Sequence, residues 1–220
     1  MGRRAGRPPL TRQRIIETAL ALIDEVGLDG LSMRQLGRRL EVDPMAIYHH
    51  LPSKNELLQA VVRHVFAKLP VRSAGGSWQQ RVKQWARDYR GVAGSHPNLV
   101  LRIVAEPLAV AVAAVQANES LYAALEAGGL PADIVVLGAD LIVDYVNGVA
   151  VATATGAVQD PAALAAFEAE LAAQPPERVA VQRRLLDEAD YAGRDSFEFG
   201  LEVILAGLQR RRTASDVPPA

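Results

Sequence analysis

The sequence predicts an all-α protein, in which a three-helix unit of the helix-turn-helix type precedes a larger helical body. Apolar residues recur every three or four positions along most segments, as they do on one face of a helix. The alternation of apolar and polar residues that is typical of strands does not occur in the sequence. Capping residues, glycines and prolines divide the apolar pattern into segments of helix length.

The first two helices carry recognisable start and stop signals. The first is expected over 11–26, where Thr11 can cap the N-terminus and Gly27 stops the helix. The second is expected over 32–40. Ser32 and Gln35 form a capping-box pattern, in which each side chain satisfies a free backbone N–H of the first turn.

A short third helix and a longer fourth one follow. Residues 43–44 combine a capping aspartate with a proline that is preset for the first helical position. The third helix must end before Pro52, after barely two turns. Ser53 and Glu56 form a second capping-box pattern, which opens a helix with one wide apolar face.

The rest of the chain is expected to contain only helices. We predict a basic arm over 1–10, the helix-turn-helix unit over 11–69, a linker over 70–76, a helical body over 77–212 and a disordered tail over 213–220. The body helices are expected over 77–94, 98–105, 108–128, 131–156, from 160 onward, 176–190 and 196–212.

The expected helix over 131–156 differs from an ordinary surface helix. Its valines, leucines and isoleucines cover nearly the whole circumference, which indicates burial all round. We expect one side to meet the body interior and the other a partner subunit. Residues 197–208 of the last helix are a natural companion for that interface.

Charge is distributed unevenly along the chain, although the formal total is only −1. Residues 1–68 hold eleven Lys and Arg against seven Asp and Glu, whereas residues 69–220 hold thirteen against eighteen. A basic first third favours a nucleic-acid-facing module attached to a body with another role. The absence of cysteine excludes disulfides, thiolate metal sites and a cysteine nucleophile.

The apolar segments predict neither a secretion signal nor a membrane span. The basic start MGRRAGRPPL has no apolar stretch behind it, as a signal peptide would. The most apolar region, 133–157, carries Asp140, Asp144 and Asn147, a polar density that membrane spans seldom tolerate. We therefore expect a cytoplasmic protein without a membrane partner.

Residues 31–58 have the order of helix, tight turn and short helix that defines the helix-turn-helix motif. In this motif the second helix enters the major groove of DNA and the other helix crosses the backbone. Ile47 and Leu51, four residues apart, are expected on the buried side. Lys54 and the free N–H groups after Ser53 are placed to hold a phosphate, and arginines at 34, 38 and 39 add positive charge.

At this point a family resemblance can be stated. The stretch LSMRQLGRRLEVDPMAIYHHLPSKNELL resembles the DNA-binding region of the TetR family of bacterial transcription regulators. The preceding TRQRIIETALALIDEVGLDGLS extends the similarity. In the body, GGSW and SFEFGLEVILAGL resemble the first segment and the closing helix of the family's tetracycline repressors.

The resemblance implies a set of DNA contacts in the reading region. These are Arg34, Pro44, Met45, Ala46, Tyr48, His49, His50 and Lys54. Tyr48 and Lys54 match the phosphate-binding types of the motif, while Met45 and Ala46 offer apolar contact for a thymine methyl. Two alternatives stay open: Tyr48 packs in the core beneath the helix, and His49 is a solvated spacer.

The N-terminal arm is a second candidate for DNA contact. It contains Gly6-Arg7-Pro8, the core of a short basic element that lies in AT-rich minor grooves. The alternative is a disordered tail that aids solubility. Arg3, Arg4 and Arg7 would still add nonspecific, salt-sensitive affinity in that case.

In this family the body forms a dimer and holds a small-molecule pocket that controls the DNA-binding heads. The resemblance places near such a pocket Trp85, Tyr89, Ile103, Val136, Ala139, Asp140 and Val143. Ile103 and Ala152 stand where a histidine and a glutamate take part in magnesium-tetracycline binding. We therefore expect an apolar or aromatic effector, and no metal or other cofactor.

Two further groups of polar residues allow more than one interpretation. Asp140 and Asp144, four apart, could meet a cationic ligand group, or could cap the dimer seam or pair with arginine. Catalysis is not expected, because His49 and His50 are successive and point about 100° apart on a helix. The sequence also lacks a Gly-rich phosphate loop, a nucleophilic serine motif and an HExxH motif.

The sequence thus predicts a ligand-responsive transcriptional repressor. It would bind a palindromic operator in double-stranded DNA as a homodimer, and a small effector would release it. The alternative is a DNA-binding regulator without a small-molecule ligand, in which the long apolar helix would be pure dimer core.

Overall fold

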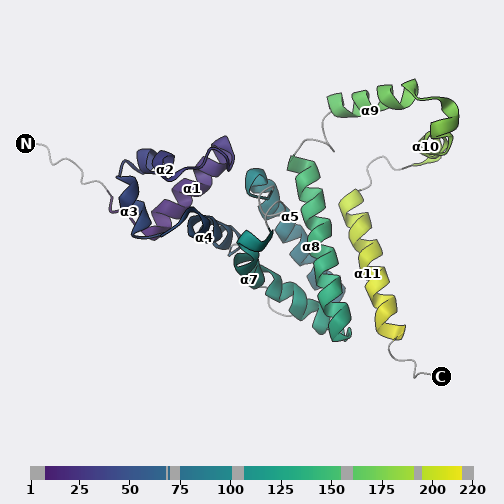
Figure 1. Cartoon of the computed structure of the whole chain (residues 1–220). Helices are drawn as coiled ribbons and strands as arrows, with labels where there is room; N and C mark the ends of the chain where they lie inside the picture. The colour runs from purple at the N-terminus through teal and green to yellow at the C-terminus, as the bar shows by residue number, and fades with distance from the viewer. Residues whose placement is uncertain are drawn as a thin grey trace, which may run out of the picture.

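The computed structural model describes residues 8–67, 69, 75–100, 107–154, 161–190 and 195–214. Over these residues every regular element is a helix, which confirms the predicted all-α class (Figure 1). The helices are α1 (Arg12–Val26), α2 (Met33–Leu40), α3 (Pro44–Tyr48), α4 (Lys54–Phe66), α5 (Trp78–Ser95), α7 (Pro107–Glu126), α8 (Ala132–Ala154), α9 (Pro161–Ala173), α10 (Pro176–Glu188) and α11 (Ser196–Ala214).

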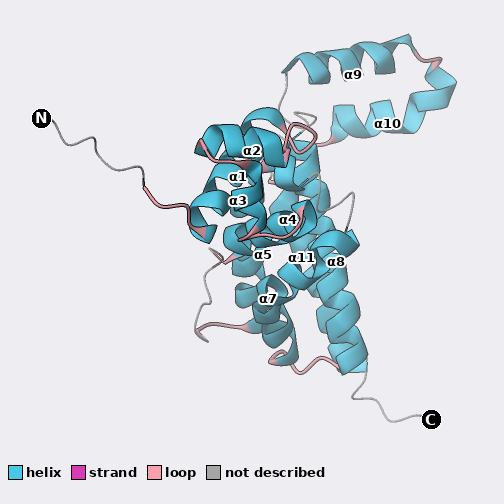
Figure 2. Cartoon of the chain, turned by 60° about the vertical axis from the view of Figure 1, so that its left-hand side comes forward, coloured by secondary structure: helices cyan, strands magenta, loops and turns pink. Residues whose placement is uncertain are grey.

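Helices α1 to α4 form a compact head around an apolar core (Figure 2). Ile15 and Ile23 of α1, Leu36 of α2 and Ile47 of α3 have no exposed surface, and Leu57 of α4 closes the same core. The predicted starts and stops of α1 are confirmed. Thr11 accepts a hydrogen bond from the Arg14 N–H at 3.2 Å, and Gly27 ends the helix with a φ of 72°.

The capping boxes predicted for α2 and α4 are confirmed only in their serine half. The Ser32 hydroxyl accepts from the Gln35 N–H at 3.1 Å, but the Gln35 carbonyl oxygen lies against that hydroxyl and not against the backbone N–H. Ser53 likewise accepts from the Glu56 N–H at 3.0 Å. A complete box occurs at the start of α5, between Ser77 and Gln80.

The body is a bundle of α5, α7, α8 and α11, against which α4 of the head also packs (Figure 1). Polar contacts hold α11 along α5: Arg87 makes two hydrogen bonds to Glu198, at 2.6 and 2.8 Å, and Lys83 contacts Glu202 at 2.7 Å. The pKa of Glu198 is lowered by its hydrogen bond to Arg87. Helices α9 and α10 form a hairpin that projects from this bundle (Figures 1 and 2).

Helix α8 is buried on one side in the single chain, which agrees with the expected contact with the body interior, and burial of the other side by a partner subunit stays a prediction. Its buried row is Val135, Ala139, Ile142, Val146 and Ala150. On the opposite side Leu137 and Leu141 are 64% and 50% exposed, and on neighbouring α11 Phe199 and Val203 are 62% and 55% exposed. We call these four residues the α8–α11 face.

Several helix boundaries differ from the prediction by one or two residues. Helix α7 begins at Pro107, one residue before the predicted start at 108, because a proline at the first helical position lacks only an N–H that the helix leaves free. Helix α11 continues to Ala214, beyond the predicted start of the tail at 213. Of the predicted helix over 98–105, residues 98–100 are helical and the rest lie outside the described residues, as does most of the predicted linker.

Among the described helices, α8 has the length and hydropathy of a membrane span. Its buried row nevertheless packs on the other helices of the body. Asp140 and Asp144 lie on its exposed part. We therefore assign α8 as the core helix of the body.

Candidate functional site

The reading helix α3 is fixed from below by buried residues and from its start by a cap. The Asp43 carboxylate accepts from the Met45 N–H at 2.8 Å, and Pro44 occupies the first turn, both as predicted. Ile47 is fully buried and Leu51 is 1% exposed. The turn before α3 is closed by the Val42 N–H, which donates to the Gly37 carbonyl at 2.9 Å.

The opposite side of α3 is open to solvent. Met45 is 63% exposed and Tyr48 is 38% exposed, so Tyr48 does not pack in the core beneath the helix. Helix α3 ends at Tyr48, and His49 is its C-cap. His50 belongs to the following turn, where its N–H donates to the Ile47 carbonyl at 2.9 Å. The two exposed histidines therefore belong to different local structures, His49 to the end of α3 and His50 to the turn after it.

Positively charged residues lie near this exposed surface, and one of them is paired with a carboxylate. Arg34 on α2 and Lys54 at the N-terminus of α4 are exposed. Arg39, in contrast, donates from its two terminal guanidinium nitrogens to the Glu25 carboxylate of α1, and the bond from Nη1 measures 2.9 Å. That hydrogen bond raises the pKa of Arg39, and the Glu25 carboxylate offsets the positive charge that Arg39 adds to α2. The arm residues Arg3, Arg4 and Arg7 lie outside the described residues.

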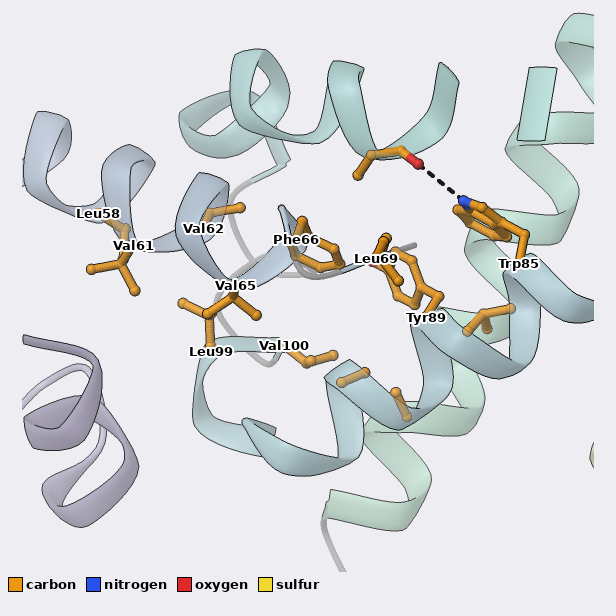
Figure 3. Packing of buried hydrophobic residues seen from close by; sticks show 14 of the residues in the cluster. Leu58, Val61, Val62, Val65, Phe66, Leu69, Trp85, Tyr89, Leu99 and Val100 are labelled. Carbon is orange, nitrogen blue, oxygen red and sulfur yellow. Dashed lines mark hydrogen bonds between the residues drawn. The ribbon is translucent and has the colours of Figure 1, made fainter. Parts of the chain in front are cut away.

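In the body, an aromatic row joins the head to α8 (Figure 3). The Phe66 ring of α4 lies 5.0 Å from the Tyr89 ring of α5, and the Tyr89 ring lies 5.1 Å from that of Trp85, both pairs being tilted by 41°. The Trp85 indole N–H donates to the Ala117 carbonyl at 2.9 Å, and the Tyr89 hydroxyl donates to the Asn147 side chain at 2.7 Å. Burial raises the pKa of Tyr89 well above its usual value, so the hydroxyl keeps its proton and acts as the donor.

Three of the four predicted pocket residues on α8 share one flank of that helix, and the fourth, Ala139, belongs to the buried row. Positions 136, 140, 143 and 147 follow the spacing of a single helical side, and Asn147 on this side is the residue that meets Tyr89. Val136 is 47% exposed, Asp140 is exposed and Val143 is half-buried, whereas Trp85, Tyr89 and Ala139 are buried. Ile103 lies outside the described residues.

A second tyrosine borders the same flank. Burial raises the pKa of Tyr122 on α7, and the nearby negative charge of Asp140 raises it further. The flank therefore brings apolar surface next to the Asp140 carboxylate, the Asn147 amide and two tyrosines. The link from Tyr89 to Asn147 was missed by sequence reasoning, because nothing local relates two residues 58 positions apart.

An open groove of about 610 Å³ lies elsewhere, along α10. Val181, Leu185 and Leu186 contribute to its lining. Every residue of the lining belongs to the projecting hairpin, and none belongs to the flank of α8. The groove and the flank of α8 therefore do not coincide.

Replacing Asn147 with leucine is expected to lower the free energy of unfolding by about 1–3 kcal/mol, because the buried Tyr89 hydroxyl loses its acceptor. Urea unfolding followed by circular dichroism measures the change. Combining it with Tyr89→Phe removes the orphaned hydroxyl, so the double variant should recover part of the loss. Equal stability of the wild type and Asn147→Leu would contradict a stabilising role for this pair.

Among the described residues, no group of three His, Cys, Asp or Glu side chains could hold a metal ion. His49 and His50 stand apart from such a cluster, and the His64 ring lies 3.4 Å from the Gln13 side chain. His96 contacts Asp24. The histidines thus remain available for roles other than shared metal ligation.

Known proteins resemble the chain along nearly its whole length. Residues 15–61 match the profile described as bacterial regulatory proteins, tetR family, and residues 69–212 match the tetracyclin repressor-like C-terminal domain. An HTH-type transcriptional regulator of Saccharopolyspora erythraea is 31% identical over 207 residues, which cover 92% of this chain and 86% of that protein. The class A tetracycline repressor from transposon 1721 of Escherichia coli is 31% identical over 202 residues, 90% of each chain.

Solved structures extend the similarity to three dimensions. Apo ActR of Streptomyces coelicolor superposes with a TM-score of 0.80 at 28% identity, covering 96% of this chain and all 100% of ActR. The complex of ActR with actinorhodin gives a TM-score of 0.76 at 29% identity, covering 92% of this chain and 98% of ActR.

An exposed reading helix on a small head, followed by a separate helical body, defines a helix-turn-helix DNA-binding protein. The two profile matches and the full-length relatives make the assignment specific. The chain belongs to the TetR family of bacterial transcription regulators. Like its relatives, it is a regulator and not an enzyme.

Proposed function

We propose that this protein is a cytoplasmic, homodimeric repressor that binds a palindromic operator and is released by a small apolar or aromatic effector. The observation that carries the proposal is the pairing of two exposed surfaces on one chain. One is the solvent-facing side of α3, held over the buried Ile47. The other is the apolar α8–α11 face, which a second copy would cover.

Dimerisation through the α8–α11 face would place two heads about a two-fold axis. Each α3 would then enter a major groove, with half-sites about one helical turn apart. Tyr48 and Lys54 would hold phosphates, while Met45 and Ala46 would contact apolar base surface. Pro44, His49, His50 and Arg34 complete the proposed contacts, and Arg3, Arg4 and Arg7 of the arm would reach the minor groove.

The effector proposal rests on the composition of the α8 flank. Val136 and Val143 offer apolar surface above the buried Trp85, Tyr89 and Ala139, and Asp140 and Asn147 would be the few polar groups that orient a ligand. ActR, a structural relative, has been solved in complex with actinorhodin. To move the population from mostly bound to mostly released, an effector must prefer the released state by about 5.5 kcal/mol.

The function is tested by selecting duplexes from a random pool with the purified protein at moderate salt. A palindromic sequence should be enriched, and aromatic effector candidates should release it. Recovery of no preferred sequence would contradict the proposed operator binding. Retention of the selected duplex with every aromatic candidate would favour a regulator without a small ligand.

Replacing His49 with alanine is expected to change sequence preference at one operator position by roughly 1–3 kcal/mol, while the dimer stays folded. Repeating the duplex selection with the variant measures the change. Lys54→Ala is the matched contrast, since loss of a phosphate contact should weaken all sequences alike and reduce the salt dependence by about one ion. An unaltered selection profile for His49→Ala would assign His49 as a solvated spacer.

A further inference from the structure

The short segment over 96–100 lies between the body and two helices of the head. It follows α5, and its residues Leu99 and Val100 are 1% and 2% exposed. Leu99 lies beside Val65 of α4, within the apolar cluster that continues to Phe66 (Figure 3). This side of the segment meets α4 through apolar surface, which is non-directional and tolerates sliding.

The polar side of the same segment meets the end of α1. The His96 Nδ1 atom lies 2.9 Å from the Asp24 carboxylate. The Asn98 amide donates to the Ile23 carbonyl at 3.1 Å and is 3.3 Å from the Asp24 carbonyl. The His96 and Asp24 side chains are only 16% and 32% exposed.

The carbonyls that Asn98 contacts are among those that the end of a helix leaves without full partners. Helix α1 ends at Val26, so the carbonyls of its last turn lack intrahelical donors. The Ile23 carbonyl accepts from the Gly27 N–H at 2.9 Å, and the Asn98 amide adds a second donor from the body. These bonds are directional, unlike the contact with α4.

We propose that Asp24, His96 and Asn98 form a clasp that fixes the orientation of the head on the body. The clasp joins residues 72 to 75 positions apart in the chain, across the two parts of the molecule. In the dimer it sets the spacing of the two reading helices, a consequence that rests on the proposed function. Its effect on the head of a single chain does not depend on DNA or on an effector.

A neighbouring ion pair supplies an internal comparison. Glu25, one residue beyond Asp24, binds Arg39 of α2, so this pair joins two helices of the same head. Both pairs involve a carboxylate at the end of α1. Only the pair of Asp24 and His96 crosses to the body, so the two differ in what they can position.

The clasp can be tested by measuring the distance between head and body in the full chain. The sequence has no cysteine, so spin labels can be placed at Ala21→Cys on α1 and Ala123→Cys on α7, both exposed positions. Diluting the labelled chain with excess unlabelled chain leaves only the distance within one chain. Pulsed dipolar spectroscopy then gives the distribution of head orientations.

We expect the double variant His96→Ala and Asn98→Ala to broaden this distribution. The ratio of misoriented to docked heads should rise roughly five-fold for each hydrogen bond removed. Asp24→Ala should act in the same direction from the head side, which keeps the test valid if the double variant does not fold. Glu25→Gln should leave the distribution unchanged. His96→Asn should keep a narrow distribution like that of the wild type, because the asparagine amide can donate to Asp24 where His96 Nδ1 does.

The same variants should bind operators with altered half-site spacing more evenly than the wild type. A wild type without any preferred operator would overturn the repressor proposal but leave the distance measurement intact. An unchanged distance distribution in both Asp24→Ala and the double variant would overturn the clasp.

Discussion

Replacing Leu141 with arginine is expected to convert the dimer to monomers and to lower operator affinity roughly a hundredfold or more. Leu141 is 50% exposed on the α8–α11 face, opposite the buried row of α8. A second copy packed on this face would enclose two unpaired guanidinium groups, which is strongly unfavourable. Monomers bind each half-site separately and lose the avidity of two linked heads, which is on the order of 10²–10⁴.

Sedimentation velocity measures the oligomeric state of this variant, and fluorescence anisotropy with the selected duplex measures its affinity. Val115→Arg is the matched control, because Val115 is 65% exposed but lies on α7, outside the face. The control should stay dimeric with wild-type affinity. A dimeric Leu141→Arg protein would mean that the chains associate through another surface.

The α8–α11 face is already assembled in the single chain, which is why one charge should be so damaging. Arg87 and Lys83 of α5 hold α11 through Glu198 and Glu202. On α8, the Tyr145 hydroxyl donates to the Phe197 carbonyl at 3.1 Å, and the two rings stack at 5.8 Å. Association would therefore require little reordering, so most of the apolar burial can contribute to affinity.

The helices could be predicted from the sequence where their signals are local. The caps at Thr11, Ser32, Asp43 and Ser53 each act within three residues, and all four form the expected bond to a backbone N–H. The reciprocal bond from Gln35 fails because its side chain meets the serine hydroxyl first. Local patterns indicate which groups are able to pair and leave open which pairing prevails.

The candidate sites also contain features that local sequence patterns predict and others that depend on how the helices pack. The exposed side of α3 follows from the spacing of Ile47 and Leu51, whose burial leaves the other side to solvent. The contacts of Arg39 with Glu25 and of His96 with Asp24 depend on how helices pack in space. The sequence therefore counted Arg39 only as positive charge near the reading helix and gave His96 no role.

The close approach of α2 to the start of α3 predicts a second large effect, for Gly37→Val. A Cβ atom at Gly37 would lie 3.0 Å from the Val42 carbonyl oxygen and 3.1 Å from the Pro44 ring. The branched side chain of valine would add two methyl groups in the same space. We expect the head to lose about 1–3 kcal/mol of stability and the reading helix to be displaced.

Displacement of α3 matters more for DNA binding than for folding, because Pro44 begins the helix whose exposed side faces the groove. Each base contact that loses its geometry costs about 1–3 kcal/mol, so operator affinity should fall roughly a hundredfold or more at a temperature where the variant remains folded. Gly91→Val is the control: it places the same side chain on α5, where a Cβ atom would meet nothing within 4 Å. That variant should keep wild-type affinity, because the new side chain meets no neighbour. Valine is also a better helix former than glycine, so α5 should not lose stability. If Gly37→Val bound the operator as tightly as Gly91→Val does, the contact between α2 and α3 could not be what positions the reading helix.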